Sequence, residues 1–179
     1  MPLYEFEGKR PTIDPTAWIA ESADIIGDVL IGPRSYIGWN AVLRGDHGRI
    51  IIGAGSAVEE GVIVHISPGF DSRIGPEATI GHGAMLHNAT IDAFAVIGIR
   101  ATVSNFATVG EWSIIGEMGL VRERQTIPPG VIAVGQPVKI IGQIQSRHKE
   151  RWLAAKKRYQ ELTRRNKKSL KRVQFSIFQ

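Results

Sequence analysis

The sequence predicts a mainly β protein: a parallel β-helix of six-residue repeats, followed by one C-terminal α-helix. Three observations predict it. An aliphatic residue recurs every six positions, a small residue lies four positions after most of these anchors, and glycine often follows the anchor directly. This spacing fits neither an amphipathic helix, which repeats near 3.6, nor a two-sided strand, which repeats at about 2. It fits a short strand followed by a tight corner, and three such units would close one triangular coil.

The anchors define the expected core of the stacked coils. They are Ile13, Ile19, Ile25, Ile31, Ile37, Leu43, Ile52, Val58, Val64, Ile74, Ile80, Leu86, Ile91, Ile97, Val103, Val109, Ile115, Val121 and Ile127. β-branched anchors favour strands, and we expect Gly, Asn and Asp to supply the unusual backbone angles of the corners. A β-sandwich is the alternative, but its strands alternate and its loops vary in length.

Composition indicates one domain without cysteine chemistry. A chain of 179 residues is long enough for one hydrophobic core, and the absence of cysteine excludes disulfides, thiolate metal sites and a cysteine nucleophile. The N-terminal residues lack the basic and apolar regions of a signal peptide, and no apolar run approaches the length of a membrane span. We therefore expect a cytoplasmic protein.

The charge is divided between two segments. Residues 1–138 carry nine Lys and Arg against fifteen Asp and Glu, whereas residues 139–179 carry thirteen against two. We expect a β-helix domain over 1–138 and a basic C-terminal segment over 139–179. Within the basic segment, a helix from about Ser146 to Lys168 would pack on the β-helix through Trp152, Ala155, Tyr159 and Leu162, with Lys and Arg in water. An anionic substrate or a neighbouring subunit could meet the basic face, but no stacking aromatics indicate nucleic acid.

Two interruptions of the repeat indicate where the chemistry lies. The step from Leu43 to Ile52 is nine residues long and includes Arg44–Arg49, and the step from Val64 to Ile74 is ten residues long and includes His65–Arg73. We expect both insertions to leave the coil as loops, where functional sites gather on rigid scaffolds.

Three histidines are the candidate metal ligands. His65 and His87 each directly follow an anchor, and three strand units separate them, so their rings should lie on one face of adjacent coils, about 4.8 Å apart. His82 follows its anchor by two residues and belongs to the preceding face. A three-histidine site therefore needs a second molecule, and a closed homotrimer is the simplest arrangement. A lone outward histidine is usually a surface residue, which is our interpretation of His47 and His148.

Three neutral imidazoles without a thiolate are typical of a Zn²⁺ site with an open fourth position. Co²⁺ and Fe²⁺ are alternative occupants of such a site.

Several motifs resemble the γ-class carbonic anhydrases and their relatives, which include proteins encoded with phenylacetate and carnitine metabolism. They are Gly8-x-x-Pro11-x-Ile13, Gly27-Asp28-Val29, Leu43-Arg44-Gly45-Asp46, Val64-His65, Ile80-Gly81-His82-Gly83-Ala84 and Leu86-His87. The resemblance covers roughly residues 8–138. It implies a left-handed β-helix, a homotrimer with Zn²⁺ at each subunit interface, and reversible hydration of CO2 to bicarbonate by zinc hydroxide.

The resemblance also implies roles for four further residues. Arg44 would orient bicarbonate, Asp46 would form ion pairs across the trimer interface, and Glu60 stands where the family has an aspartate that pairs with the arginine. A purely structural interface salt bridge is the alternative for Arg44 and Asp46. Glu59 replaces a glutamine that hydrogen-bonds the hydroxide.

The replacements make weak or absent CO2 hydration an expectation. An amide donates to hydroxide but an ionised carboxylate only accepts, so Glu59 would act as a base or would raise the pKa of the zinc-bound water. Ala57 replaces a family asparagine, and the loop after His65 lacks the family's proton-shuttle glutamate and offers Ser67, Pro68 and Asp71 instead.

Two alternative functions stay open. One is a coenzyme A thioesterase or acyltransferase of the hexapeptide-repeat superfamily, acting on an acyl-CoA. The other is a non-catalytic trimeric accessory protein with structural zinc.

Overall fold

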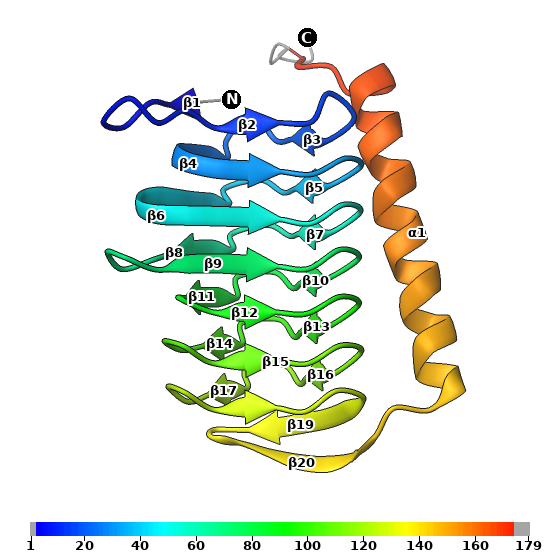
Figure 1. Ribbon diagram of the computed structural model, residues 1–179. Helices are drawn as coiled ribbons and strands as arrows, with labels where there is room; N and C mark the ends of the chain where they lie inside the picture. Colours follow the sequence, from blue (N-terminus) through cyan, green and yellow to red (C-terminus); the bar gives the residue numbers. More distant parts are fainter. Residues whose placement is uncertain (1–2, 174–179) are drawn as a thin grey trace, which may run out of the picture.

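The computed structural model describes residues 3–173 and confirms the predicted parallel β-helix with its C-terminal α-helix (Figure 1). The chain passes through three faces in each coil, and strands of successive coils pair in parallel. An eight-stranded sheet forms one face, and a twelve-stranded sheet covers the other two. The face and edge on which a residue lies therefore fix its neighbours.

The first face, here called the helix face, lies beneath helix α1 (Ser146–Ser169). Its strands are β3 (Trp18–Ile19), β5 (Tyr36–Ile37), β7 (Ala57–Val58), β10 (Thr79–Ile80), β13 (Val96–Ile97), β16 (Ile114–Ile115), β19 (Val131–Gly135) and β20 (Val138–Gln143). The last two strands pair antiparallel and close the final coil.

The second face, here called the histidine face, carries the candidate site. Its strands are β1 (Leu3–Tyr4), the first halves of β4 (Asp24–Ile31) and β6 (Val42–Ile52), then β8 (Ile63–His65), β11 (Met85–His87), β14 (Thr102–Val103) and β17 (Leu120–Val121). The third face contains β2 (Thr12–Ile13), the second halves of β4 and β6, then β9 (Asp71–Ile74), β12 (Thr90–Ile91), β15 (Thr108–Val109) and β18 (Thr126–Ile127).

The core consists of the predicted anchors. Every anchor from Ile25 to Ile127 is buried, whereas Ile13 and Ile19, in the first coil, are only partly buried because no further coil covers them. The small residues also point inward, and the buried Ser113 hydroxyl donates to the Pro128 carbonyl of the next coil.

The glycines that follow the anchors act differently from the prediction. They do not adopt left-handed backbone angles. These angles occur at the corner residue three positions after the anchor, which is Gly or Asn in some coils, as predicted, but in others a residue such as Phe94, Arg100 or Trp112. A Cβ added to Gly53 would lie 2.4 Å from the Pro76 backbone nitrogen, and one added to Gly98 would lie 2.6 Å from that of Glu117. Glycine is needed here because the backbone of the next coil passes so close.

The two insertions behave differently from each other. Residues 66–70 form a loop between β8 and β9. The loop prediction for His65–Arg73 is confirmed for this middle part only, because His65 belongs to β8 and Asp71–Arg73 belong to β9. The loop prediction for Arg44–Arg49 is wrong, because β6 runs unbroken through them and pairs with β4 and β9. The extra residues are accommodated by a register shift opposite Gly27 and Val29. Residues 44–49, which lie beside His65, are therefore part of a hydrogen-bonded strand.

Helix α1 runs back along the helix face from the last coil to the first coils (Figure 1). The predicted stripe of Trp152, Ala155, Tyr159 and Leu162 is partly buried. The expectation that every Lys and Arg lies in water is wrong for Lys156, which is 2% exposed. Its buried ammonium donates a hydrogen bond to the Thr79 hydroxyl at 2.9 Å. No helix within residues 3–173 has an apolar stretch that could cross a membrane. Residues 174–179 of the predicted basic segment lie outside the described residues.

Candidate metal centre

His65 and His87 form a pair at one edge of the histidine face. They end strands β8 and β11, and the register places them directly opposite each other. Their ring centroids are 5.0 Å apart, and Nδ1 of His65 lies 3.1 Å from Nε2 of His87. The predicted same-face register is confirmed, and two nitrogens of adjacent coils converge on one point.

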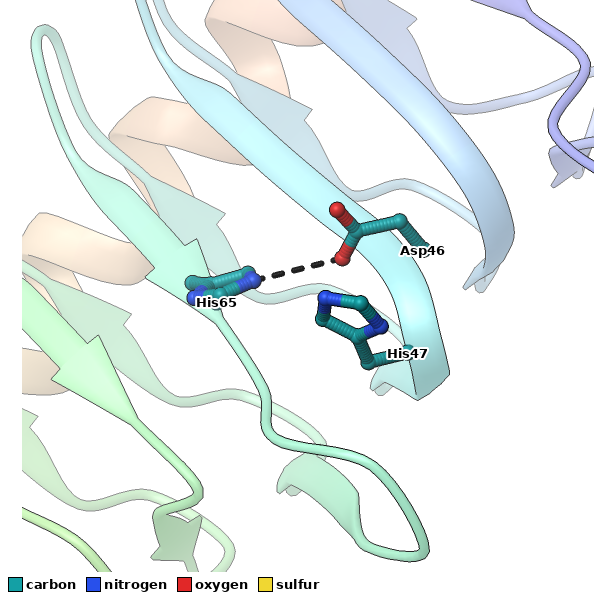
Figure 2. Close-up of side chains that lie close together, drawn as sticks. All are labelled: Asp46, His47 and His65. Carbon is teal, nitrogen blue, oxygen red and sulfur yellow. Dashed lines mark hydrogen bonds and ion pairs between the residues drawn. The ribbon is translucent and has the colours of Figure 1, made fainter.

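The second nitrogen of His65 faces a carboxylate. Its Nε2 lies 3.2 Å from Oδ1 of Asp46 (Figure 2), and Arg44 Nη1 donates to the other Asp46 oxygen at 2.6 Å. Burial opposes ionisation of Asp46, but the hydrogen bond and charge of Arg44 keep its pKa below the usual range. Burial, together with the Arg44 charge, lowers the pKa of His65. Both effects favour a neutral imidazole next to an ionised carboxylate.

The second nitrogen of His87 faces an amide. Its Nδ1 contacts Oδ1 of Asn105, and the Asn88 amide nitrogen donates to that same oxygen at 3.0 Å. Asn88 also donates to the Ser67 hydroxyl at 3.0 Å and accepts from the Ser67 backbone at 2.7 Å. This network ties the 66–70 loop to the ring of His87.

His82 lies at the opposite edge of the histidine face, on the turn after β10. Two carboxylates hold its ring. Nε2 lies 3.1 Å from Glu59 Oε2, and Nδ1 lies 2.7 Å from Glu60 Oε2. The ring is nevertheless 46% exposed. The two carboxylates therefore fix the orientation of a ring that is still open to solvent.

The carboxylates around His82 are supported from the helix side. Tyr36 Oη donates to Glu60 Oε1 at 2.6 Å, and the Tyr159 hydroxyl of α1 hydrogen-bonds Glu59. The two tyrosine rings meet with centroids 5.0 Å apart. Burial raises the pKa of Glu59, although His82 and Tyr159 work against that rise. Helix α1 thus contacts the second half of the candidate site.

His47 is exposed, as its interpretation as a surface residue predicted, but it also lies next to the candidate site. Its ring centroid is 6.0 Å from that of His65 (Figure 2), and donor atoms of Asp46, His47 and His65 lie within 4.8 Å of one another. This set could hold a metal within one chain. It would compete with the His65–His87 pair for a metal, because both sets use His65.

An apolar row separates the two histidine edges. Ile63 and Met85 are paired neighbours on the outer side of the histidine face, and they are 41% and 44% exposed. Thr102 follows Met85 in the register, and the partly buried Leu120 lies one coil beyond it. Exposed aliphatic side chains gathered on one face are typical of an interface.

The structure brings the predicted site residues together in two groups. Arg44, Asp46, His65 and His87 form one, and Glu59, Glu60 and His82 form the other. Sequence reasoning missed Asn105, Asn88, Tyr36 and Tyr159. The sequence offered one signal for these residues, which is that Asn88 directly follows the candidate ligand His87.

No family model matches the sequence. The carnitine operon protein CaiE of Escherichia coli O157:H7 is 44% identical over 101 residues, which is 56% of this chain and 52% of the relative. The match thus spans about half the length of these curated relatives.

Two solved structures match over nearly the whole chain. A Bacillus cereus protein, proposed to be an acetyltransferase, has 32% identity and a TM-score of 0.91, covering 92% of this chain and 96% of its own. A hexapeptide transferase family protein from Anaplasma phagocytophilum has 32% identity and a TM-score of 0.87, covering 91% and 96%.

The fold and the paired histidines define a class: left-handed β-helices of hexapeptide repeats with polar sites at their edges. Within that class, the chain belongs to the family of hexapeptide-repeat proteins that includes its Anaplasma phagocytophilum relative, and about half of it is similar to CaiE.

Proposed function

We propose that this protein is a homotrimeric, γ-class carbonic anhydrase-like metalloenzyme that hydrates CO2 reversibly to bicarbonate. His65 and His87 of one subunit and His82 of the next would hold Zn²⁺, with Co²⁺ or Fe²⁺ as alternatives. When bound, such an ion supplies the Lewis acidity that makes water nucleophilic near neutral pH.

The arrangement of His65 and His87 carries the proposal. Nitrogens that share one tetrahedral zinc ion at roughly 2.0–2.1 Å lie about 3.3 Å apart, and the observed separation is 3.1 Å. The remaining nitrogens face Asp46 and Asn105. Metal-binding histidines usually use their second nitrogen in this way, which fixes ring orientation and tautomer.

The surrounding residues have separable tasks. Arg44 is 43% exposed in its side chain, so its guanidinium can both hold Asp46 and bind the anionic product. Asp46 orients His65. Glu60 positions His82 through Nδ1, and the metal would take Nε2 in place of that nitrogen's contact with Glu59. Glu59, next to that nitrogen, can hold a proton at Oε2 during the reaction.

The trimer is supported by the shape of the histidine face. The two half-sites lie at opposite edges of one face, so a single chain does not bring them together. A cyclic arrangement would cover the apolar row of Ile63 and Met85 and would place each His82 against the neighbour's pair. Complete sites would then exist only between subunits.

Metal analysis combined with stopped-flow CO2 hydration tests the proposal. We expect about one zinc ion per chain, and we expect His87→Ala to lose both metal and hydration. His148→Gln is the control, since it removes a histidine outside the site and keeps the pairing of Gln145 with residue 148 at the start of α1. Zinc-loaded trimer without hydration would reject the anhydrase activity and favour a structural role for zinc.

A second candidate is a coenzyme A thioesterase or acyltransferase. The specific support is the description of the two full-length structural relatives, one as an acetyltransferase and one as a hexapeptide transferase. Turnover of phenylacetyl-CoA or crotonyl-CoA by zinc-loaded protein would favour this candidate over CO2 hydration.

A further inference from the structure

We propose that the cleft between helix α1 and the helix face binds the acyl group of a short-chain coenzyme A thioester, with its carbonyl next to Glu59 and His82. The proposal rests on the coenzyme A candidate above, and it names both the substrate class and its subsite. The site lies within one chain, on the side of His82 that faces α1.

The cleft exists because α1 is not parallel to the face beneath it. The helix packs most closely on β3 and β5, where Tyr159 meets Tyr36. Its first turns stand off from β13 and β16 and leave a cavity of about 350 Å³. This volume lies at the lower end of the range of ligand pockets, roughly 300–1,000 Å³. It suits a short chain and excludes a long one.

The lining of the cleft is mainly apolar. On the sheet side, the wall of the cleft consists of Val96, Ile114 and Ile132 from three successive coils. Trp152 of α1 forms the opposite wall. An apolar lining of this kind favours hydrocarbon, at roughly fourfold in affinity for each methylene removed from water. A short acyl chain therefore fits both the size and the surface of the cleft.

Glu59 and His82 line the same cleft. Glu59 Oε2 accepts a hydrogen bond from the His82 backbone at 3.2 Å and lies 3.1 Å from His82 Nε2. A chain on the apolar lining would thus present its polar end to the group that we place at the metal. Glu59 and His82 thus belong both to the cleft and to the candidate metal site, which an ordinary gap beneath a helix would not provide.

The cation in the lining of the cleft is Arg151 of α1. It is exposed and forms no ion pair within residues 3–173. Glu59 and Glu117 also line the cleft, but among the exposed residues of α1 over 146–158 there are five Lys and Arg against one Glu, so the helix beside the cleft is basic. The phosphates of coenzyme A complement this charge, whereas a free carboxylic acid would use the apolar part alone.

Titration calorimetry on the full-length, zinc-quantified protein tests the assignment with four probes: butyryl-CoA, acetyl-CoA, coenzyme A and butyrate. Butyryl-CoA has two more methylenes than acetyl-CoA and should bind roughly fifteenfold more tightly. Ile114→Trp, which fills the cleft, should weaken butyryl-CoA at least tenfold and leave coenzyme A nearly unchanged. Ile132→Phe serves the same purpose if the tryptophan variant does not fold.

Arg151→Gln should weaken butyryl-CoA and coenzyme A equally, and Arg164→Gln, outside the cleft, should weaken neither. Equal affinity for butyryl-CoA and acetyl-CoA, or full affinity in both cleft-filling variants, would overturn the acyl subsite. Butyrate binding as tightly as butyryl-CoA would overturn the coenzyme A assignment. Zinc content of the same samples separates the two ideas, since a loss of butyryl-CoA binding at full zinc content leaves the metalloenzyme proposal intact.

Discussion

Asp46 Oδ1 lies 3.2 Å from Nε2 of His65, and the other nitrogen of the same ring faces His87. The carboxylate thus sits behind the ring, on the side away from the point where the two histidines converge. Arg44 holds the pKa of Asp46 low against the effect of burial, which keeps the carboxylate ionised at neutral pH. An ionised carboxylate behind a histidine raises the basicity of its free nitrogen.

Asp46→Asn should therefore lower zinc affinity by about 10–100-fold, because the amide keeps the shape but not the charge. Competition with a chromogenic chelator measures this. Asp71→Asn is the control, since Asp71 is exposed and pairs with Arg73 instead of a histidine. Equal affinity of the wild type and Asp46→Asn would show that the carboxylate does not tune the site.

Mixing two inactive variants tests whether the site is shared between subunits. His65→Ala trimers and His82→Ala trimers should each lack zinc at the site. Any cyclic trimer that contains both kinds of subunit regains one complete site out of three. Differently tagged subunits allow mixed trimers to be isolated, and their zinc content should be about one third of the wild-type value. Zinc in the unmixed His82→Ala trimers, which keep Asp46, His47 and His65, would favour that set within one chain, and mixed trimers without zinc would reject the shared site.

Met85→Glu should dissociate the trimer and release its zinc, because it places a charge in the middle of the apolar row. The monomer should stay folded, since the side chain points outward and is already 44% exposed. Sedimentation velocity and metal analysis measure the two effects. Leu153→Glu is matched in exposure, at 46%, and lies on α1. A Met85→Glu variant that stays trimeric would place the interface on another face.

Lys156→Met should stabilise the protein at pH 7. Burial lowers the pKa of Lys156 from 10.5 to about 8, which corresponds to about 3 kcal/mol against the charged form. Loss of the hydrogen bond to Thr79 offsets about 1 kcal/mol, so the net gain is about 2 kcal/mol. Urea unfolding measures this, and Lys157→Met, at an exposed position, should change little.

The pH dependence checks the cause. Between pH 8 and about 10.5 the unfolded chain keeps the Lys156 proton that the folded chain has released, so the stability of the wild type rises with pH in this range. The advantage of Lys156→Met should shrink across the same window. An advantage that does not vary with pH would mean that packing, rather than desolvation of the ammonium, is responsible.

The sequence predicted most of the fold because one rule repeats. Once Ile80 and Leu86 are recognised as anchors, the register of every coil follows, including the pairing of His65 with His87. The same rule could not show that β6 stays paired through Arg44–Arg49, because that depends on the partners in β4 and β9.

The six-residue repeat also could not predict contacts between elements that are distant in the sequence. Helical periodicity indicates which side of α1 faces the coils, but not the angle at which the helix crosses them. The burial of Lys156 and the bond from Tyr159 to Glu59 both depend on that angle. Asn105 reaches His87 from the next coil through a side-chain rotamer that no spacing specifies.

The return path of α1 changes how the molecule should come apart. A plain stack of coils can unravel one unit at a time from either end, because each unit touches only its neighbours. Here Lys167 contacts the Pro15 carbonyl, Gln160 binds Glu77 and Lys156 binds Thr79, so one helix fastens coils far apart along the stack. Before the coils at the C-terminal end can unfold, α1 must lose its contacts with the β-helix along its whole length. The molecule should therefore resist gradual fraying and lose its coils together.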